Sequence, residues 1–146
     1  MNVYFICTGN TCRSPMAEAI FQSENKEGMY VRSAGIYAME DGDISMNTKQ
    51  VIQEAGIDYT HFSRPISEDD VRWADLVLTM TSAHKQMVMQ AYPFAADKIF
   101  TLKEYVRPYG SHDVSDPFGG DIHMYRQTFS ELASLMKDLH EKLENE

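Results

Sequence analysis

The N-terminal stretch of the chain combines an apolar run, a short polar segment and a proline. Val3–Ile6 is a run of strand-favouring apolar residues and predicts a buried β-strand. Pro15 suits the first position of a helix, where its missing N–H costs nothing, and Ser14 before it is a good N-cap. We therefore expect residues 8–14 to form a loop that joins the carboxyl end of a strand to the start of a helix.

A loop in this position is suited to binding an anion, because its backbone N–H groups face the ligand at the positive end of the helix dipole. Gly9 is expected to let the chain turn where a side chain would clash. Cys7 and Arg13 lie at the two ends of the loop, so both can face one bound anion. Arg13 can donate to two oxygens of a tetrahedral anion, and we expect these surroundings to lower the pKa of Cys7 and favour its thiolate.

A thiolate beneath a phosphoryl group, with an arginine beside it, is arranged for attack at phosphorus and formation of a phosphocysteine. The alternative is a packed cysteine and a surface arginine, since the spacing of Cys7 and Arg13 by itself occurs by chance. The strand, Gly9, Ser14 and Pro15 around the pair favour the catalytic interpretation.

The stretch from Cys7 to Glu18 resembles the signature of the low-molecular-weight protein-tyrosine phosphatases, and the resemblance covers nearly the whole chain. Further matching motifs follow in the expected order: Ser33-Ala34-Gly35, Gly56-Ile57-Asp58, His61, Ser63-Arg64, Ala74–Met80 and Asp116-Pro117. The resemblance implies a metal-independent cysteine phosphatase without a cofactor, acting on phosphorylated proteins. It assigns the substrate-binding loop to Thr8, Gly9, Asn10, Thr11, Cys12 and Arg13.

The rest of the chain predicts alternating strands and helices within one domain over residues 1–146. We expect strands near residues 29–34, 75–80 and 98–102, and helices from Pro15 to about Lys26 (ended by Gly28), from Ser45 to about Ala55, from Ser67, over 82–91 and from Asp121. This order predicts an α/β fold: a three-layer sandwich in which a four-stranded parallel sheet carries helices on both faces. Ligands of such folds bind beyond the carboxyl ends of the strands, where the phosphate-binding loop after the first strand lies.

Composition excludes several other classes of protein. The apolar content of 43% argues against disorder, and no apolar run approaches the roughly 20 residues of a membrane span. The net charge of −9 argues against a nucleic-acid partner. Two cysteines beside one loop and the lack of a visible signal peptide favour a reducing cytoplasm. We expect a cytoplasmic monomer with neither membrane nor nucleic-acid partners.

The resemblance also assigns a general acid, Asp116, which Pro117 holds in an extended conformation. In the mechanism it implies, Cys7 attacks phosphorus while Asp116 protonates the leaving group, and Arg13 and the loop amides hold the equatorial oxygens. Water deprotonated by Asp116 then cleaves the phosphocysteine, so no metal-activated water is needed. A turn-forming Asp-Pro pair is the alternative, and Asp113 is the alternative acid.

Supporting roles follow from the same resemblance: Asn10 and Ser14 hold the loop, Ser14 helps to hold the thiolate, and His61 lies behind the loop. Cys12 is expected to form a reversible disulfide with Cys7 under peroxide, the alternative being a small core residue. The remaining histidines lack ligand-like spacing, and we expect surface positions for His84, His112, His123 and His140.

The pocket departs from the tyrosine-specific pattern. Those enzymes typically carry a branched apolar residue in place of Thr11, an aromatic near Met39 and a tyrosine pair in place of Phe118 and Gly119. A phenyl ring favours apolar walls, whereas a phosphoguanidine gains from a hydroxyl at Thr11 and a carboxylate at Asp116. The motif resembles the protein arginine phosphatase branch of the family, with phosphotyrosine as the alternative substrate and Phe118 as a second specificity residue.

Two further functions are alternatives to this interpretation. Thioredoxin-coupled arsenate reductases share the fold and a similar loop, but they need further cysteines, and this chain has only Cys7 and Cys12. A non-catalytic anion- or phosphoprotein-binding module needs no nucleophile and no acid. The joint presence of Cys7, Arg13 and Asp116 therefore favours an enzyme.

Overall fold

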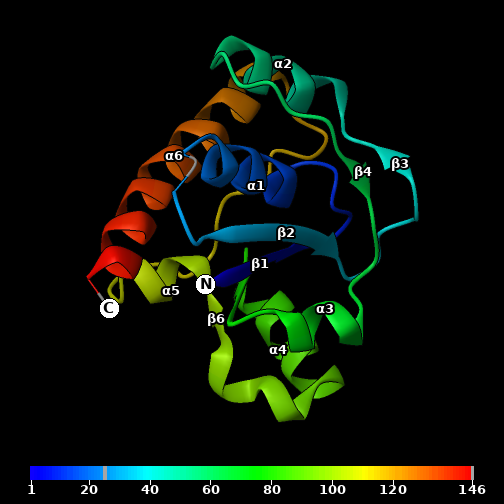
Figure 1. The fold of residues 1–146 in the computed structure, drawn as a ribbon. Helices are drawn as coiled ribbons and strands as arrows, with labels where there is room; N and C mark the ends of the chain where they lie inside the picture. Colours follow the sequence, from blue (N-terminus) through cyan, green and yellow to red (C-terminus); the bar gives the residue numbers. More distant parts are fainter. Residues whose placement is uncertain (25, 146) are drawn as a thin grey trace.

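The computed structural model describes residues 1–24 and 26–145, which form a four-stranded sheet, a two-stranded sheet and the helices around them (Figure 1). The strands are β1 (Asn2–Cys7), β2 (Tyr30–Gly35), β3 (Gly42–Asp43), β4 (Phe62–Ser63), β5 (Leu76–Thr79) and β6 (Ile99–Thr101). The helices are α1 (Arg13–Ser23), α2 (Met46–Glu54), α3 (Glu68–Trp73), α4 (Ser82–Ala91), the 3-10 helix η1 (Pro93–Lys98), α5 (Leu102–Val106) and α6 (Ile122–Glu144).

The larger sheet has the strand order β2-β1-β5-β6 with every neighbouring pair parallel, which confirms the predicted four-stranded parallel sheet. Cys7 pairs with Gly35, so β1 and β2 end together at one edge of the sheet. The loop after β1 begins at this edge. The short strands β3 and β4 form a separate antiparallel ladder that the sequence did not predict, because two-residue strands carry no readable periodicity.

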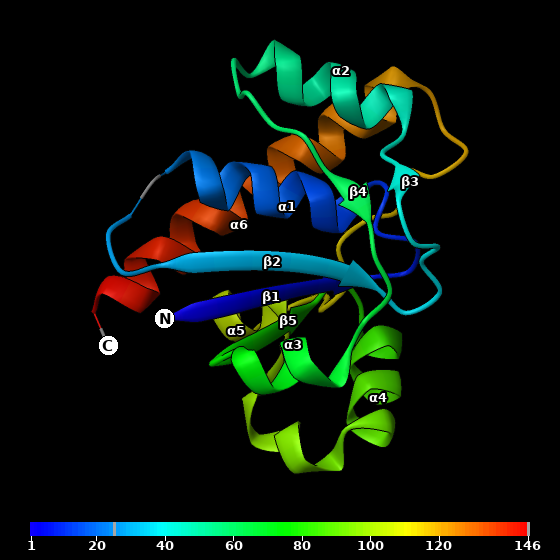
Figure 2. The same ribbon diagram turned by 45° about the vertical axis from the view of Figure 1, so that its right-hand side comes forward.

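Helices cover both faces of the sheet, as predicted (Figures 1 and 2). Val3 and Phe5 of β1 belong to the core shared with α1, α2, α5 and α6. Tyr4 and Ile6, which alternate with them, belong to the core shared with α3, α4 and η1. Successive strand residues point to opposite faces, so a strand that is apolar throughout has to be covered on both sides.

Helix α1 begins earlier than predicted. It starts at Arg13 with Cys12 in the N-cap position and no side-chain cap, so the predicted N-cap role of Ser14 is wrong. Pro15 therefore lies within the first turn, where its missing N–H still breaks no intrahelical hydrogen bond. The consequence is that the Ser14 hydroxyl is available for another partner.

Other element boundaries also differ from the prediction. Helix α1 ends at Ser23 instead of near Lys26, and residue 25 of that predicted span lies outside the described residues. Gly28 has a φ of 77° in the turn before β2, so it does not end the helix. Leu102, predicted as the last residue of a strand, instead opens α5, because a capping box forms at that helix start.

Three predicted helix starts are confirmed in detail. The side chains of Ser45, Ser67 and Asp121 each accept a hydrogen bond from a backbone N–H in the first turn, opening α2, α3 and α6. Such caps satisfy donors that have no partner within the helix, and each stabilises its helix by about 1 kcal/mol.

The long helix α6 is amphipathic and buries Leu132, Leu135 and other apolar residues. Across residues 1–24 and 26–145, no helix combines the length and apolar character needed to cross a membrane.

The end of β2 packs directly against the loop after β1. Backbone N–H groups just beyond Gly35 donate to the carbonyl oxygens of Cys7 and Thr8. A Cβ on Gly35 would lie 2.5 Å from the Thr8 carbonyl oxygen and 2.8 Å from the Asn10 nitrogen, closer than Cβ atoms approach backbone in proteins. The loop can therefore take this position only because residue 35 is a glycine.

We expect Gly35→Ala to lower the free energy of unfolding by about 1–3 kcal/mol, since both neighbouring atoms belong to the backbone and cannot turn aside. Gly9→Ala is the matched control on the same loop, because a Cβ there would meet only the Thr11 hydroxyl oxygen at 3.6 Å. Thermal denaturation of both variants measures the difference. Equal losses in the two variants would contradict the assignment of the close approach to Gly35.

Candidate active site

A cavity of about 290 Å³ lies at the carboxyl end of β1. It is lined by Cys7, Thr8, Gly9, Thr11, Cys12, Arg13, Asp116 and Phe118. A larger cavity of about 620 Å³ lies at the opposite end of β1, beside Asn2 and Trp73, and its lining contains no cysteine. The smaller cavity therefore holds the predicted nucleophile, arginine and acid together, although these residues come from segments more than a hundred positions apart.

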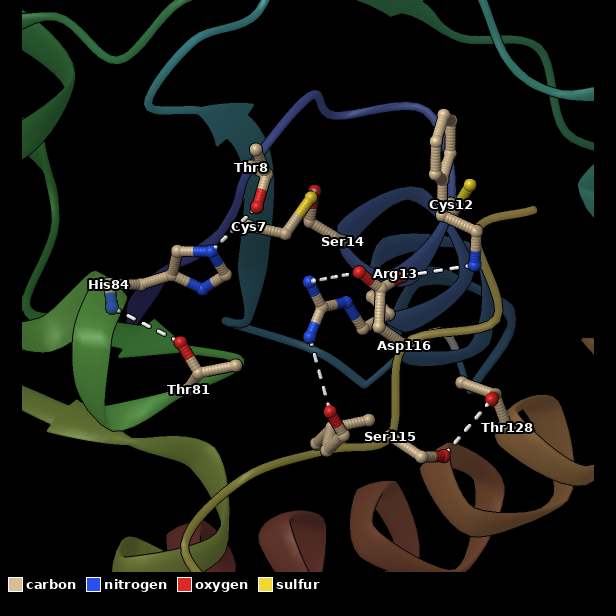
Figure 3. A network of polar contacts seen from close by, with 12 residues as sticks. Cys7, Thr8, Cys12, Arg13, Ser14, Thr81, His84, Ser115, Asp116 and Thr128 are labelled. Atoms are coloured by element: carbon tan, nitrogen blue, oxygen red, sulfur yellow. Dashed lines mark hydrogen bonds and ion pairs between the residues drawn. The ribbon is translucent and has the colours of Figure 1, made fainter. Parts of the chain in front are cut away.

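Cys7 lies at the inner end of this cavity and is almost fully buried (Figure 3). Its Sγ is 2.8 Å from Ser14 Oγ, and the backbone N–H of Asn10 donates to it at 3.3 Å. Burial raises the pKa of the Cys7 thiol, whereas Ser14, the Asn10 amide and the charge of Arg13 act in the opposite direction. The expectation of a lowered pKa is therefore wrong for this pocket, because the sequence does not show how deeply the sulfur is buried.

Asn10 adopts a left-handed backbone conformation, with a φ of 56°, which bends the loop around the sulfur. The side-chain clash predicted at Gly9 is absent, because a Cβ there would meet only Thr11 Oγ1, at 3.6 Å. The Asn10 side chain points away from the cavity: its Nδ2 donates to Ser14 Oγ at 2.8 Å and to Ser33 Oγ at 3.0 Å. Asn10 was predicted among the substrate-binding residues, but it does not line the cavity and instead supports the loop.

His61 and Glu18 continue this buried network behind the loop. His61 Nε2 is 2.7 Å from Asn10 Oδ1, and His61 Nδ1 is 3.8 Å from Glu18 Oε2. Burial and the nearby Arg64 lower the pKa of His61 to about 4, and burial raises the pKa of Glu18. Ser33 donates to Glu18 at 2.8 Å. No role was predicted for Glu18, although it is the last residue of the stretch that resembles the family signature.

Arg13 connects the loop after Cys7 to the loop that carries Asp116, the predicted acid (Figure 3). Its guanidinium is buried, donates to the Val114 carbonyl oxygen at 3.1 Å and lies 3.4 Å from Asp116 Oδ2. Asp116 is about half-exposed and accepts a hydrogen bond from the Phe118 N–H at 3.0 Å. Asp113, the alternative acid, does not line the cavity; it accepts from the Ser82 N–H at the start of α4.

The walls of the cavity are formed by Thr11, Cys12 and Phe118. Thr11 reaches the cavity, as the specificity argument requires, and its Oγ1 is 3.7 Å from Cys12 Sγ. Cys12 is a free, buried thiol whose Sγ lies 3.6 Å from Tyr125 Oη. Phe118 is 78% exposed, so it borders the mouth of the cavity and does not fill it. Cys7 and Cys12 share the cavity lining, and their disulfide stays a prediction.

Two of the remaining histidines are buried, contrary to expectation. His84 on α4 lies with its Nε2 2.8 Å from Thr8 Oγ1, beside the nucleophile. His140 on α6 is stacked on Phe21 with ring centroids 4.4 Å apart. The sequence did contain a signal for this position of His84. The residue lies in the first helical turn after a strand, and that strand ends at the edge of the sheet where the cavity lies. Within the described residues, no group of three or more His, Cys, Asp or Glu is placed to hold a metal ion.

The chain is similar to known phosphatases over nearly its whole length. The family model for low molecular weight phosphotyrosine protein phosphatase matches residues 2–146. A protein-arginine-phosphatase of Bacillus subtilis is 47% identical over 150 residues, which cover 100% of this chain and 99% of that protein. The YwlE arginine phosphatase of Geobacillus stearothermophilus has a structure with a TM-score of 0.96 at 44% identity, covering 99% of this chain and 93% of that one. A YwlE mutant with a phosphorylated active-site serine matches with a TM-score of 0.94 at 45% identity, covering 99% and 96%.

We expect Ser14→Ala to raise the pKa of Cys7, because it removes the hydroxyl that stabilises the thiolate. A hydrogen bond to a charged group contributes about 1.5–3 kcal/mol, which corresponds to a shift of roughly one to two pH units. The pH dependence of Cys7 carboxymethylation, followed by mass spectrometry, measures the shift. Ser33→Ala is the control, since Ser33 also accepts from Asn10 but does not contact Cys7. Equal shifts in the two variants would assign the effect to loop support alone.

Proposed function

The chain belongs to the low molecular weight phosphotyrosine protein phosphatase family, and on that premise we propose that it removes phosphate from phosphoarginine residues of proteins. The observation that carries the proposal is that Cys7, Arg13 and Asp116 line one cavity, whose lining also includes Thr11. The arginine phosphatases named above, similar over nearly the whole chain, support the same substrate.

The first step of the proposed reaction uses Cys7 and the loop. The thiolate attacks phosphorus, an S–P bond forms, and the bond from phosphorus to the guanidine nitrogen breaks. Arg13 and the loop N–H groups stabilise the charge on the equatorial oxygens as it develops. The phosphorylated active-site serine in the YwlE mutant supports an enzyme-bound phosphoryl intermediate on the corresponding residue of that protein.

Asp116 serves both steps in this proposal. Its carboxyl group lines the cavity beside Arg13 and is open to solvent, so it can give a proton to the leaving nitrogen and later take one from water. That water attacks phosphorus, the S–P bond breaks, and phosphate and the Cys7 thiolate are released. The atoms and charges of these two steps balance without a metal or a cofactor.

The preference for phosphoarginine rests on two polar groups of the cavity lining, the Thr11 hydroxyl and the Asp116 carboxyl group. A phosphoguanidine presents N–H donors around a planar group, and these need acceptors inside the cavity. Thr11 lines the cavity with a hydroxyl that can accept such a hydrogen bond, and Asp116 lines it with the carboxyl group that protonates the leaving nitrogen. The exposed ring of Phe118 at the mouth can cover the aliphatic stem of the substrate side chain. We further propose that the protein acts as a monomer in a reducing cytoplasm, where its two thiols stay free.

Asp116→Asn should lower kcat for phosphoarginine peptides by about 10²–10⁴-fold, the range typical of general acid–base catalysis. The loss should be smaller with p-nitrophenyl phosphate, whose leaving group needs little protonation. Asp113→Asn is the matched control, because its amide oxygen can still accept from the Ser82 N–H. Steady-state kinetics with both substrates make the comparison. A larger loss in Asp113→Asn would show that the acid is assigned to the wrong residue.

Thr11→Ile should depress phosphoarginine hydrolysis and raise phosphotyrosine hydrolysis, because it replaces a hydroxyl with apolar bulk. An unmet polar group in a dry pocket costs about 1–3 kcal/mol, or roughly 5- to 150-fold in kcat/KM. A phenyl ring pays no such cost and gains apolar contact.

Rates on matched phosphoarginine and phosphotyrosine peptides test this prediction and the proposed function together. Thr11→Ser, which keeps the hydroxyl, should retain the arginine preference, and Cys7→Ser should be inactive on both peptides. A parallel fall of both activities in Thr11→Ile would indicate damage to the loop. A wild-type preference for phosphotyrosine would replace the arginine assignment with the tyrosine phosphatase function.

A further inference from the structure

The residue after the nucleophile is held by a side chain from another layer of the fold. Thr8 lines the cavity, and its Oγ1 lies 2.8 Å from Nε2 of His84 on α4 (Figure 3). This contact joins the outer side of the loop to the helix that follows β5. It is separate from the Asn10 network, which holds the loop from behind.

The backbone of His84 is held at the start of α4. Its backbone N–H donates to Thr81 Oγ1 at 3.1 Å, which caps α4, and the adjacent Ser82 N–H donates to Asp113. Burial and the positive charge of Arg13 lower the pKa of His84 to about 4. The imidazole is therefore neutral near pH 7, with one nitrogen that donates and one that accepts.

The environment of the second ring nitrogen distinguishes the two neutral tautomers. Nδ1 of His84 is buried and has no hydrogen-bond partner among the described residues. A proton on Nδ1 would be a buried donor without an acceptor, which is unfavourable. Buried N–H groups without partners are rarer in proteins than acceptors short of a donor. The proton therefore belongs on Nε2, the nitrogen that faces Thr8.

We propose that His84 is a positioning residue: its Nε2–H donates to Thr8 Oγ1 and leaves the Thr8 hydroxyl proton free to donate to a phosphoryl oxygen in the cavity. A hydroxyl has one proton, and the Thr8 oxygen that accepts from His84 can still turn that proton toward an anion. The hydroxyl then adds a donor to those of Arg13 and the loop amides, where charge develops in the transition state.

The proposal rests on the proposed phosphoryl transfer but not on the preference for arginine. A donor to the phosphoryl group acts on every substrate, whatever its leaving group. Loss of the His84–Thr8 contact should therefore lower kcat by the same factor for phosphoarginine and phosphotyrosine peptides. The effect of Thr11→Ile, in contrast, should have opposite signs for the two.

The tautomer is tested directly, without turnover, by long-range ¹H–¹⁵N NMR of the full chain at neutral pH. The His84 signals are assigned by their loss in His84→Gln. We expect the pattern of a neutral ring with the proton on Nε2. A proton on Nδ1, or a cationic ring, overturns the proposal even if the enzyme proves to have another substrate.

Kinetics test the function of the contact. Thr8→Val should lower kcat by about 10²-fold, the loss typical of removing one hydrogen-bond donor from an oxyanion hole. His84→Leu should cause a similar loss, and Thr8→Val with His84→Leu should be no worse than Thr8→Val alone. Multiplicative losses in the double variant would show that His84 acts by another route and overturn the proposal.

Retention of activity in a conservative variant distinguishes a positioning role of His84 from a purely structural one. His84→Gln places an amide N–H as many bonds from Cα as Nε2, so it should keep most of kcat. His84→Asn reaches only the position of Nδ1 and should behave like His84→Leu. His123→Leu, at an exposed position on α6, is the control and should change neither kcat nor stability. If His84→Gln and His84→Asn lose activity equally, the proposed donor role is wrong.

Discussion

The geometry of the site depends on one buried asparagine. Asn10 is fully buried, and its side-chain amide donates to Ser14 and Ser33 while its carbonyl oxygen meets His61 Nε2 and the Arg64 N–H. Its left-handed backbone turns its own N–H toward the Cys7 sulfur. A buried polar group costs free energy unless its partners are present, so a fully satisfied asparagine specifies one loop conformation.

That conformation explains how a chain of net charge −9 can hold an anion. The positive field is local: it comes from the start of α1, the loop N–H groups and the buried guanidinium of Arg13. Burial alone disfavours the charged form of Cys7, and the Ser14 hydroxyl, the Asn10 amide and Arg13 oppose it. The reactivity of the sulfur therefore depends on the placement of these few groups, and not on the overall charge of the protein.

The loop is held from several layers of the fold at once. β2 supports its backbone through the close approach at Gly35, and α4 contacts its outer side through His84. The acid loop is joined to it through Arg13, which reaches both the Val114 carbonyl oxygen and Asp116. Cys7 and Asp116, the proposed nucleophile and acid, thus belong to one connected set of contacts and line the same cavity.

Local patterns were enough to predict the parallel sheet, the helices on both faces and the loop between Cys7 and Arg13, because strand periodicity and helix-start signals act within a few residues. Asp116, far along the chain, was predicted only through the family resemblance. Local patterns did not determine the surroundings of these residues. The raised pKa of Cys7 and the burial of His84 depend on segments that meet only in the folded chain. The family resemblance implied that Asn10 supports the loop and that Ser14 helps to hold the thiolate, and both side chains make the corresponding contacts. The local cap signal at Ser14 was wrong, because the helix starts at Arg13. Burial and the full set of hydrogen-bond partners are properties of three-dimensional packing, so no local pattern could predict them.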